Sequence, residues 1–76
     1  TLVFNAKGES WIEVMDVNRL PLLRRTLQAG ERVAVSGNEP LSVTVGHVEN
    51  VGVELRGQPY DLKPYKRGNV ARFQVK

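Results

Sequence analysis

The 76-residue chain contains no cysteine and only one histidine, His47. No disulfide can therefore stabilise it, and it has no Cys/His cluster with the spacing of a zinc site. A chain of this length buries only about 60% of the surface that its unfolded form exposes. Its stability must therefore come from side-chain packing and backbone pairing alone.

Long apolar runs are also absent. No segment has the length of a membrane span, and none has the pattern of a signal peptide. The first residue is Thr1 rather than methionine. We therefore expect residues 1–76 to be a single domain of a longer protein, whose targeting and anchoring segments lie outside this chain.

Groups suited to catalysis are scarce. A nucleophilic serine needs a neighbouring base, and His47 is the only candidate base, with no Gly-x-Ser-x-Gly motif in the chain. Glycoside hydrolysis needs two facing carboxylates, but strand alternation already explains Glu13 and Glu54 as outward residues. No glycine-rich loop precedes a helix. The sequence therefore predicts a binding or structural domain that is not an enzyme and has no catalytic residues, no cofactor and no metal.

Apolar and polar residues alternate with period two along almost the whole chain, and turn signals recur about every 8 to 12 residues. This pattern predicts an all-β fold, a small antiparallel β-sandwich of seven or eight short strands, immunoglobulin-like or jelly-roll-like. Residues 20–27 contain Pro21, so they are expected to form an edge strand or an irregular stretch, with a helical turn as the alternative. The clearest alternating segments are residues 2–6, 11–15, 32–36, 41–45, 51–56 and 70–75.

Three glycines mark places where the alternation stops. Gly57, in a hairpin-like turn, and Gly68 are expected to adopt positive φ angles. Gly46 interrupts a strand pattern, which indicates a bulge or the end of a strand.

Six of the 11 basic residues lie in the last 21 positions of a chain whose net charge is +3. Only Asp61 opposes them there. The group is consistent with a surface for an anion such as nucleic acid, phospholipid or a cell-wall polymer, although a solvated basic face is the commoner cause of such a run. The basic residues are Arg56, Lys63, Lys66, Arg67, Arg72 and Lys76.

The aromatic residues divide into core and candidate contacts. Phe4 and Phe73 share strand faces with aliphatic residues, so they are expected in the core. Trp11 lies on the opposite face of its strand from Ile12 and Val14, and it is either buried at the sheet margin or exposed as a contact platform.

Two tyrosines flank a proline near the chain end. Tyr60 and Tyr65 are expected to pack over the end of the sandwich. The alternative for Tyr65 is a contact patch with Arg67 and Arg72. The candidate partner contacts are therefore Trp11, Tyr65, Arg67 and Arg72.

Together, these residues resemble the C-terminal extracytoplasmic domain of the bacterial cell-shape protein RodZ, over nearly the whole chain. The pattern in the first part comprises Ser10, Trp11, Ile12, Glu13, Val14, Asp16, Ala29, Gly30, Glu31, Ser36, Gly37, Pro40, Leu41, Val43 and Gly46. Its strongest part comprises Val53, Glu54, Leu55, Gly57, Pro59, Asp61, Leu62, Pro64, Tyr65, Arg67, Gly68, Asn69, Val70, Ala71, Arg72 and Phe73.

The chain departs from the family in the turn after Asp16, where the family usually has glycine. Here Asn18 is the candidate for the left-handed conformation.

The resemblance implies a larger single-pass membrane protein with this domain on the extracytoplasmic, periplasmic face of the inner membrane. Its cytoplasmic domain, absent from this chain, contacts MreB. The expected function is a non-catalytic contact with periplasmic domains of wall-elongation proteins, which helps couple MreB to rod shape. Direct peptidoglycan binding and a purely structural cap are the alternatives. Nucleic-acid binding is disfavoured, because Phe4 and Phe73 are expected to point inward and the remaining aromatics do not share a strand.

Overall fold

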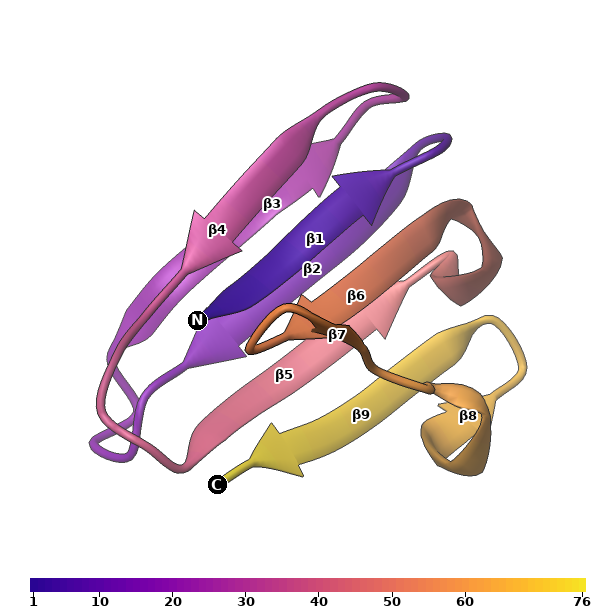
Figure 1. The fold of residues 1–76 in the computed structure, drawn as a ribbon. Coiled ribbons are helices and arrows are strands. Elements are labelled where there is room, and N and C mark those ends of the chain that lie inside the picture. Colours follow the sequence, from indigo (N-terminus) through magenta and orange to yellow (C-terminus); the bar gives the residue numbers. More distant parts are fainter.

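The computed structural model describes all residues, Thr1–Lys76, as two antiparallel sheets stacked face to face (Figure 1). One sheet has the strand order β4-β1-β6-β7 and the other β3-β2-β5-β9-β8. The predicted small β-sandwich is confirmed. The elements are β1 (Leu2–Ala6), β2 (Ser10–Met15), β3 (Pro21–Leu27), β4 (Arg32–Val35), β5 (Leu41–Gly46), the 3-10 helix η1 (Val48–Asn50), β6 (Val51–Leu55), β7 (Gln58–Pro59), the 3-10 helix η2 (Lys63–Tyr65), β8 (Lys66–Arg67) and β9 (Val70–Val75).

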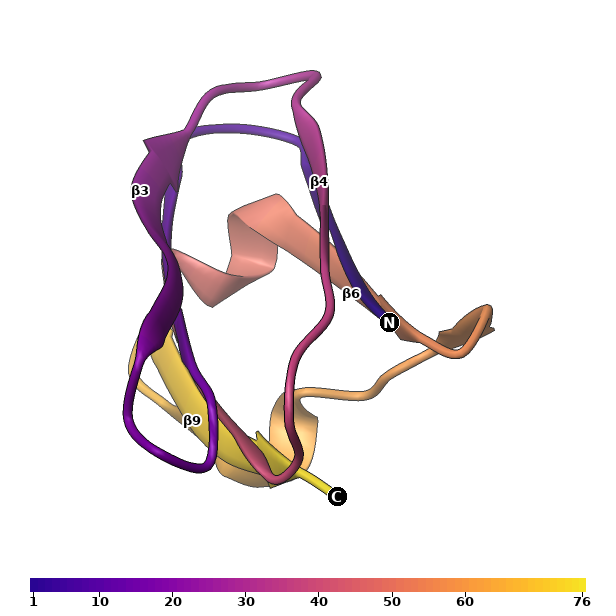
Figure 2. The same cartoon turned by 90° about the vertical axis from the view of Figure 1, so that its left-hand side faces the viewer.

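The chain passes repeatedly from one sheet to the other. Only β2–β3, β6–β7 and β8–β9 are consecutive strands paired within one sheet. Figure 2 shows the two layers edge on, with β3 and β9 on one side, β4 and β6 on the other, and η1 crossing between them. Each of the two helices is three residues long, too short to cross a membrane.

The core is a layer of 17 buried apolar residues, 15 of them from the two sheets, with Val48 from η1 and Leu62 from the segment before η2. It follows from the alternation, since β1 buries every second residue and β9 does the same. Phe4 is fully buried and Phe73 is 6% exposed, so the prediction that both lie in the core is confirmed.

β3 is an edge strand, as one of the alternatives for residues 20–27 predicted. It pairs only with β2, and Pro21 is its first residue. Proline is tolerated at the start of an edge strand because no further strand needs its missing N–H. The structure has a strand rather than a helical turn here because pairing with β2 buries Leu27 opposite Ser10.

The β6–β7 hairpin has a two-residue loop in which Arg56 has φ 53° and Gly57 has φ 79°. Two successive positive φ angles define the type I′ turn, whose twist suits a tight hairpin. Gly68 has φ 61°. The predictions of positive φ for both glycines are confirmed. The short strand β7 follows the turn at Gly57, and the short strand β8 precedes the turn at Gly68.

The prediction for Asn18 is wrong, because the left-handed residue of that turn is Arg19, with φ 64°. The side chain of Asp16 explains the difference: its Oδ1 accepts hydrogen bonds from the N–H groups of Asn18, at 2.8 Å, and Leu20, at 2.9 Å. The Arg19 N–H donates to the Asp16 carbonyl at 2.9 Å. Asn18 is thus inside the turn, and the next residue, Arg19, adopts the left-handed conformation.

We expect Gly57→Ala to destabilise the domain by about 1–2 kcal/mol, the cost of a left-handed conformation with a Cβ. Gly52→Ala is the matched control, because Gly52 lies inside β6 without a positive φ and an added Cβ would meet no atom within 4 Å. Alanine there should be neutral or stabilising by up to about 1 kcal/mol. Free energies of unfolding from chemical denaturation measure both variants. An equal loss of stability in Gly57→Ala and Gly52→Ala would contradict the type I′ turn.

We expect Phe73→Ala to cost about 3–5 kcal/mol, because it removes a buried ring and leaves a cavity. The neighbouring exposed residue of β9 supplies the control, since Gln74→Ala should change stability by only about 0.5 kcal/mol. Thermal melts measure the difference. A Phe73→Ala variant that melts close to the wild type would show that the ring is not part of the core.

Candidate functional site

The outer face of the five-stranded sheet brings three of the four predicted contact residues together. Residues directly opposite each other in an antiparallel ladder point to the same face. Trp11 pairs with Gly46, Gly46 with Val70, and Val70 with Arg67, so these residues form one row across the sheet. Arg72 lies in the next outward row, opposite Thr44. We call Trp11, Gly46, Arg67, Val70 and Arg72 the Trp11 face.

Trp11 is 41% exposed, which decides between its two predicted positions in favour of a surface platform. The indole lies against Gly46: a Cβ added to this glycine would be 3.4 Å from Cβ and Cε3 of Trp11. Gly46 is the last residue of β5, so the prediction of a strand end is confirmed. Its contact with Trp11 was not predictable from alternation, because it depends on the register between β2 and β5.

The charge of this part of the sheet comes from arginines. Glu13 and Arg24 neutralise each other in an ion pair of 2.8 Å between Oε2 and Nε. Arg67 and Arg72 belong to none of the four ion pairs of the chain. The Trp11 face therefore combines an exposed aromatic ring with two cationic groups that are free to meet an anion.

Tyr65 lies elsewhere. Its ring packs against Phe73, with centroids 5.6 Å apart, and against Tyr60 at 6.1 Å. Phe73 points into the core, so Tyr65 lies on the opposite side of the sheet from Arg67 and Arg72. Tyr60 and Tyr65 were expected to pack over the end of the sandwich, and here they form an aromatic cluster with Phe73.

The basic residues of the last third do not form one patch. Arg56 pairs with Glu39 at 3.3 Å, and Lys66 pairs with Glu49 at 2.7 Å. Lys63 and Lys66 line a pocket between the sheets rather than the Trp11 face.

His47, the only candidate base, is exposed and has φ 56°. Its Nδ1 lies 3.1 Å from the carbonyl oxygen of Glu9. A carbonyl only accepts, so Nδ1 carries the proton of this hydrogen bond. Ser10 Oγ is buried and has no hydrogen-bond partner, so no base activates it.

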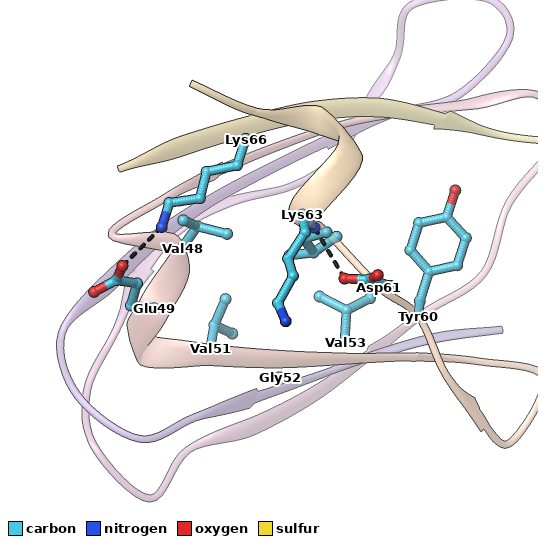
Figure 3. Close-up of a pocket in the computed structure, with 10 residues that line it drawn as sticks. Val48, Glu49, Val51, Gly52, Val53, Tyr60, Asp61, Lys63 and Lys66 are labelled. Carbon is cyan, nitrogen blue, oxygen red and sulfur yellow. Dashed lines mark hydrogen bonds and ion pairs between the residues drawn. The ribbon is translucent and has the colours of Figure 1, made fainter. Parts of the chain in front are cut away.

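The pocket is a cavity of about 310 Å³ beside β6, beneath the segment from Tyr60 to Lys66 (Figure 3). The pocket could not be predicted from the sequence, because its walls come from separate segments whose alternation patterns do not show that they lie side by side. Its apolar lining consists of Val48, Val51, Val53, Tyr60 and Leu62, and its charged lining of Glu49, Asp61, Lys63 and Lys66.

Two of the four charged groups, Glu49 and Lys66, form an ion pair, whereas Asp61 and Lys63 belong to none of the ion pairs of the chain. The Lys66 ammonium hydrogen-bonds Glu49, and this bond and its charge hold the pKa of the Glu49 carboxyl below its ordinary value. Asp61 Oδ1 accepts from the Lys63 N–H at 3.0 Å. The Lys63 ammonium has no acid partner, and its side chain extends from η2 toward β6 (Figure 3).

A comparison with protein families decides the relationship. The model of the RodZ C-terminal domain matches residues 3–74. The chain belongs to the RodZ C-terminal domain family. This membership supports a general role in bacterial cell shape, and the family is a non-catalytic one. No solved structure matches the chain.

In this RodZ C-terminal domain, we expect the stability to depend on the ionisation of Tyr60 in the aromatic cluster. The hydroxyl of Tyr60 donates to that of Tyr65 at 3.4 Å, and this contact and burial raise the pKa of Tyr60 from 10.0 to about 12. The neutral phenol is favoured in the fold, so the contribution to stability is complete below pH 10 and is lost as the pH rises through about 12.

The NMR shifts of the Tyr60 ring, followed against pH, measure this pKa directly. We expect Tyr65→Phe to move it back toward 10.0, because the accepting hydroxyl is gone while the ring stack remains. A wild-type Tyr60 that already titrates at its ordinary value would contradict the assigned contact.

Proposed function

We propose that this domain is a non-catalytic interaction module on the extracytoplasmic face of the bacterial inner membrane. In this proposal it belongs to a RodZ-like protein whose membrane helix and cytoplasmic domain lie outside the chain. The cytoplasmic domain contacts MreB, and this domain contacts periplasmic parts of wall-elongation proteins. The contact couples the MreB cytoskeleton to wall elongation and rod shape.

The observation that carries the proposal is the Trp11 face. Tryptophan and arginine are enriched among the few residues that dominate the energetics of protein interfaces. Here they project from paired strands of a sheet rather than from a loop, so little backbone freedom is lost when a partner binds. The unpaired charges of Arg67 and Arg72 favour an acidic partner surface.

Direct binding of peptidoglycan is the second candidate, and the exposed indole of Trp11 favours it. A flat ring at the surface of a sheet can stack on a sugar face, and the two arginines suit the anionic peptide stems of the polymer. A nucleic-acid partner fits less well, because stacking of successive bases needs several aromatic side chains on one face. Tyr60, Tyr65 and Phe73 instead pack against one another, away from the Trp11 face.

We expect the full-length protein with Trp11→Ala and Arg72→Ala to lose its ability to support rod shape. The control carries Arg32→Ala and Gln58→Ala, two exposed positions in strands of the four-stranded sheet. Melting of the isolated domains must first show that both variants fold. Rod shape that survives in the Trp11 and Arg72 variant would eliminate this face as the functional contact.

Soluble peptidoglycan fragments separate the two candidates. If the domain binds the wall, amide NMR shifts of residues in the Trp11 face should move together and saturate, and Trp11→Ala should abolish the change. Unmoved shifts at millimolar fragment would eliminate wall binding through this face and leave the protein contact.

A further inference from the structure

The edge of β6 that faces the pocket has backbone groups without a strand partner. The Val53 carbonyl accepts from the Tyr60 N–H at 2.8 Å, so the backbone of Val53 points toward the β7 side. In an antiparallel ladder the N–H and C=O of one residue point to the same edge. No carbonyl of Tyr60 returns a bond to the Val53 N–H, because the chain leaves the sheet there.

Val51 presents its backbone to the same edge, two residues along the strand. Its N–H donates to the Val48 carbonyl. Its own carbonyl faces no strand, because β7 pairs only with Glu54 and Leu55, and this carbonyl accepts none of the hydrogen bonds made outside the ladders. The pocket therefore contains one free acceptor, the Val51 oxygen, and one free donor, the Val53 N–H.

The side chains around these two atoms define what can bind there. Val51, Val53 and Leu62 form an apolar floor. The Lys63 ammonium belongs to no ion pair, and the Asp61 carboxylate in the same lining accepts a hydrogen bond from the Lys63 backbone N–H. The volume of about 310 Å³ lies at the lower end of the range for small-ligand sites, about 300 to 1,000 Å³. A ligand that satisfies the two backbone atoms, the apolar floor and the Lys63 ammonium has a donor and an acceptor in peptide spacing, an aliphatic side chain and a carboxylate.

The pocket has room for a chain end but not for a continuing strand. β6 begins at Val51, directly after η1, and the ion pair between Glu49 and Lys66 spans from η1 to β8 at that end (Figure 3). At the other end Tyr60 already occupies the β6 edge.

We propose that this pocket binds the carboxyl-terminal residues of a partner protein, which add to the free edge of β6 in an extended conformation. The peptide N–H donates to the Val51 oxygen, and a peptide carbonyl accepts from the Val53 N–H. An aliphatic side chain covers the valines, and the terminal carboxylate meets the Lys63 ammonium. Strand addition with a charge-assisted terminal contact is an established way of recognising peptides. The site is separate from the Trp11 face and does not depend on the function proposed above.

The test is an NMR titration of the isotopically labelled domain with the peptide acetyl-Ala-Val-Ala, which has a free carboxyl terminus. We expect saturable shifts centred on Val53, Gly52 and Lys63, with the Val53 amide moving downfield and exchanging more slowly as it gains an acceptor. The same peptide with an amidated carboxyl terminus should bind about tenfold more weakly, because a hydrogen bond to a charged group contributes at least that much. A peptide methylated on the backbone nitrogen that donates to the Val51 oxygen should also bind more weakly, because that hydrogen bond can no longer form.

Lys63→Gln should weaken binding of the free-acid peptide about tenfold and leave the amidated peptide unaffected. Lys76→Gln is the control, because this lysine follows β9 at the end of the strand remote from Gly46 and η1. Unmoved shifts at millimolar peptide would overturn the proposal, as would equal affinity for the acid and the amide, or shifts centred on Trp11. Tighter binding of a soluble wall peptide at the same amides would overturn the assignment to a protein terminus.

Discussion

The layer of apolar side chains between the two sheets is the interaction on which the rest of this domain depends. The chain has no disulfide and no metal cluster that could replace it. Because most inward positions are committed to this layer, the residues available to a partner are those that alternate with it. The Trp11 face follows from this constraint: Ile12 and Val14 must point inward, so Trp11 must point outward.

The same constraint leaves one side of the sandwich incompletely closed. β7 and β8 have two residues each, because the chain between them must cross from one sheet to the other. The stack of Tyr60, Tyr65 and Phe73 covers part of that side with aromatic rings. The rest of the side is the pocket beside β6, where a strand edge, an apolar floor and an unpaired ammonium meet.

Alternation predicted the sandwich and the inward aromatics, because each depends on burial along one strand. The edge position of β3 was predictable from Pro21, which cannot donate to a ladder. The hairpin glycines were predictable because a positive φ strongly favours glycine. Arg19 was missed because a side-chain hydrogen-bond network around Asp16 moved the left-handed position by one residue. The position of the left-handed residue in this turn therefore depends on side-chain hydrogen bonds as well as on residue preference.

The candidate site was only partly predictable. Trp11, Arg67 and Arg72 were named from residue type, but only the register shows that they share a face and that Gly46 seats the indole. One alternative for Tyr65 was a contact patch with Arg67 and Arg72. The structure separates them because η2 ends at Tyr65 and β8 begins immediately after it. A strand of two residues gives no periodicity from which its faces could be read.

The central claim is that this domain acts by contact through the outer face of the five-stranded sheet. Site-specific photo-crosslinking in growing cells tests it most directly, with the reactive group placed at Arg72 in one version of the full-length protein and at Ala34, an exposed position in the other sheet, in a second. The account predicts a discrete adduct from position 72 and none from position 34. Adducts from position 34 alone would contradict it, because the contact would then lie on the four-stranded sheet.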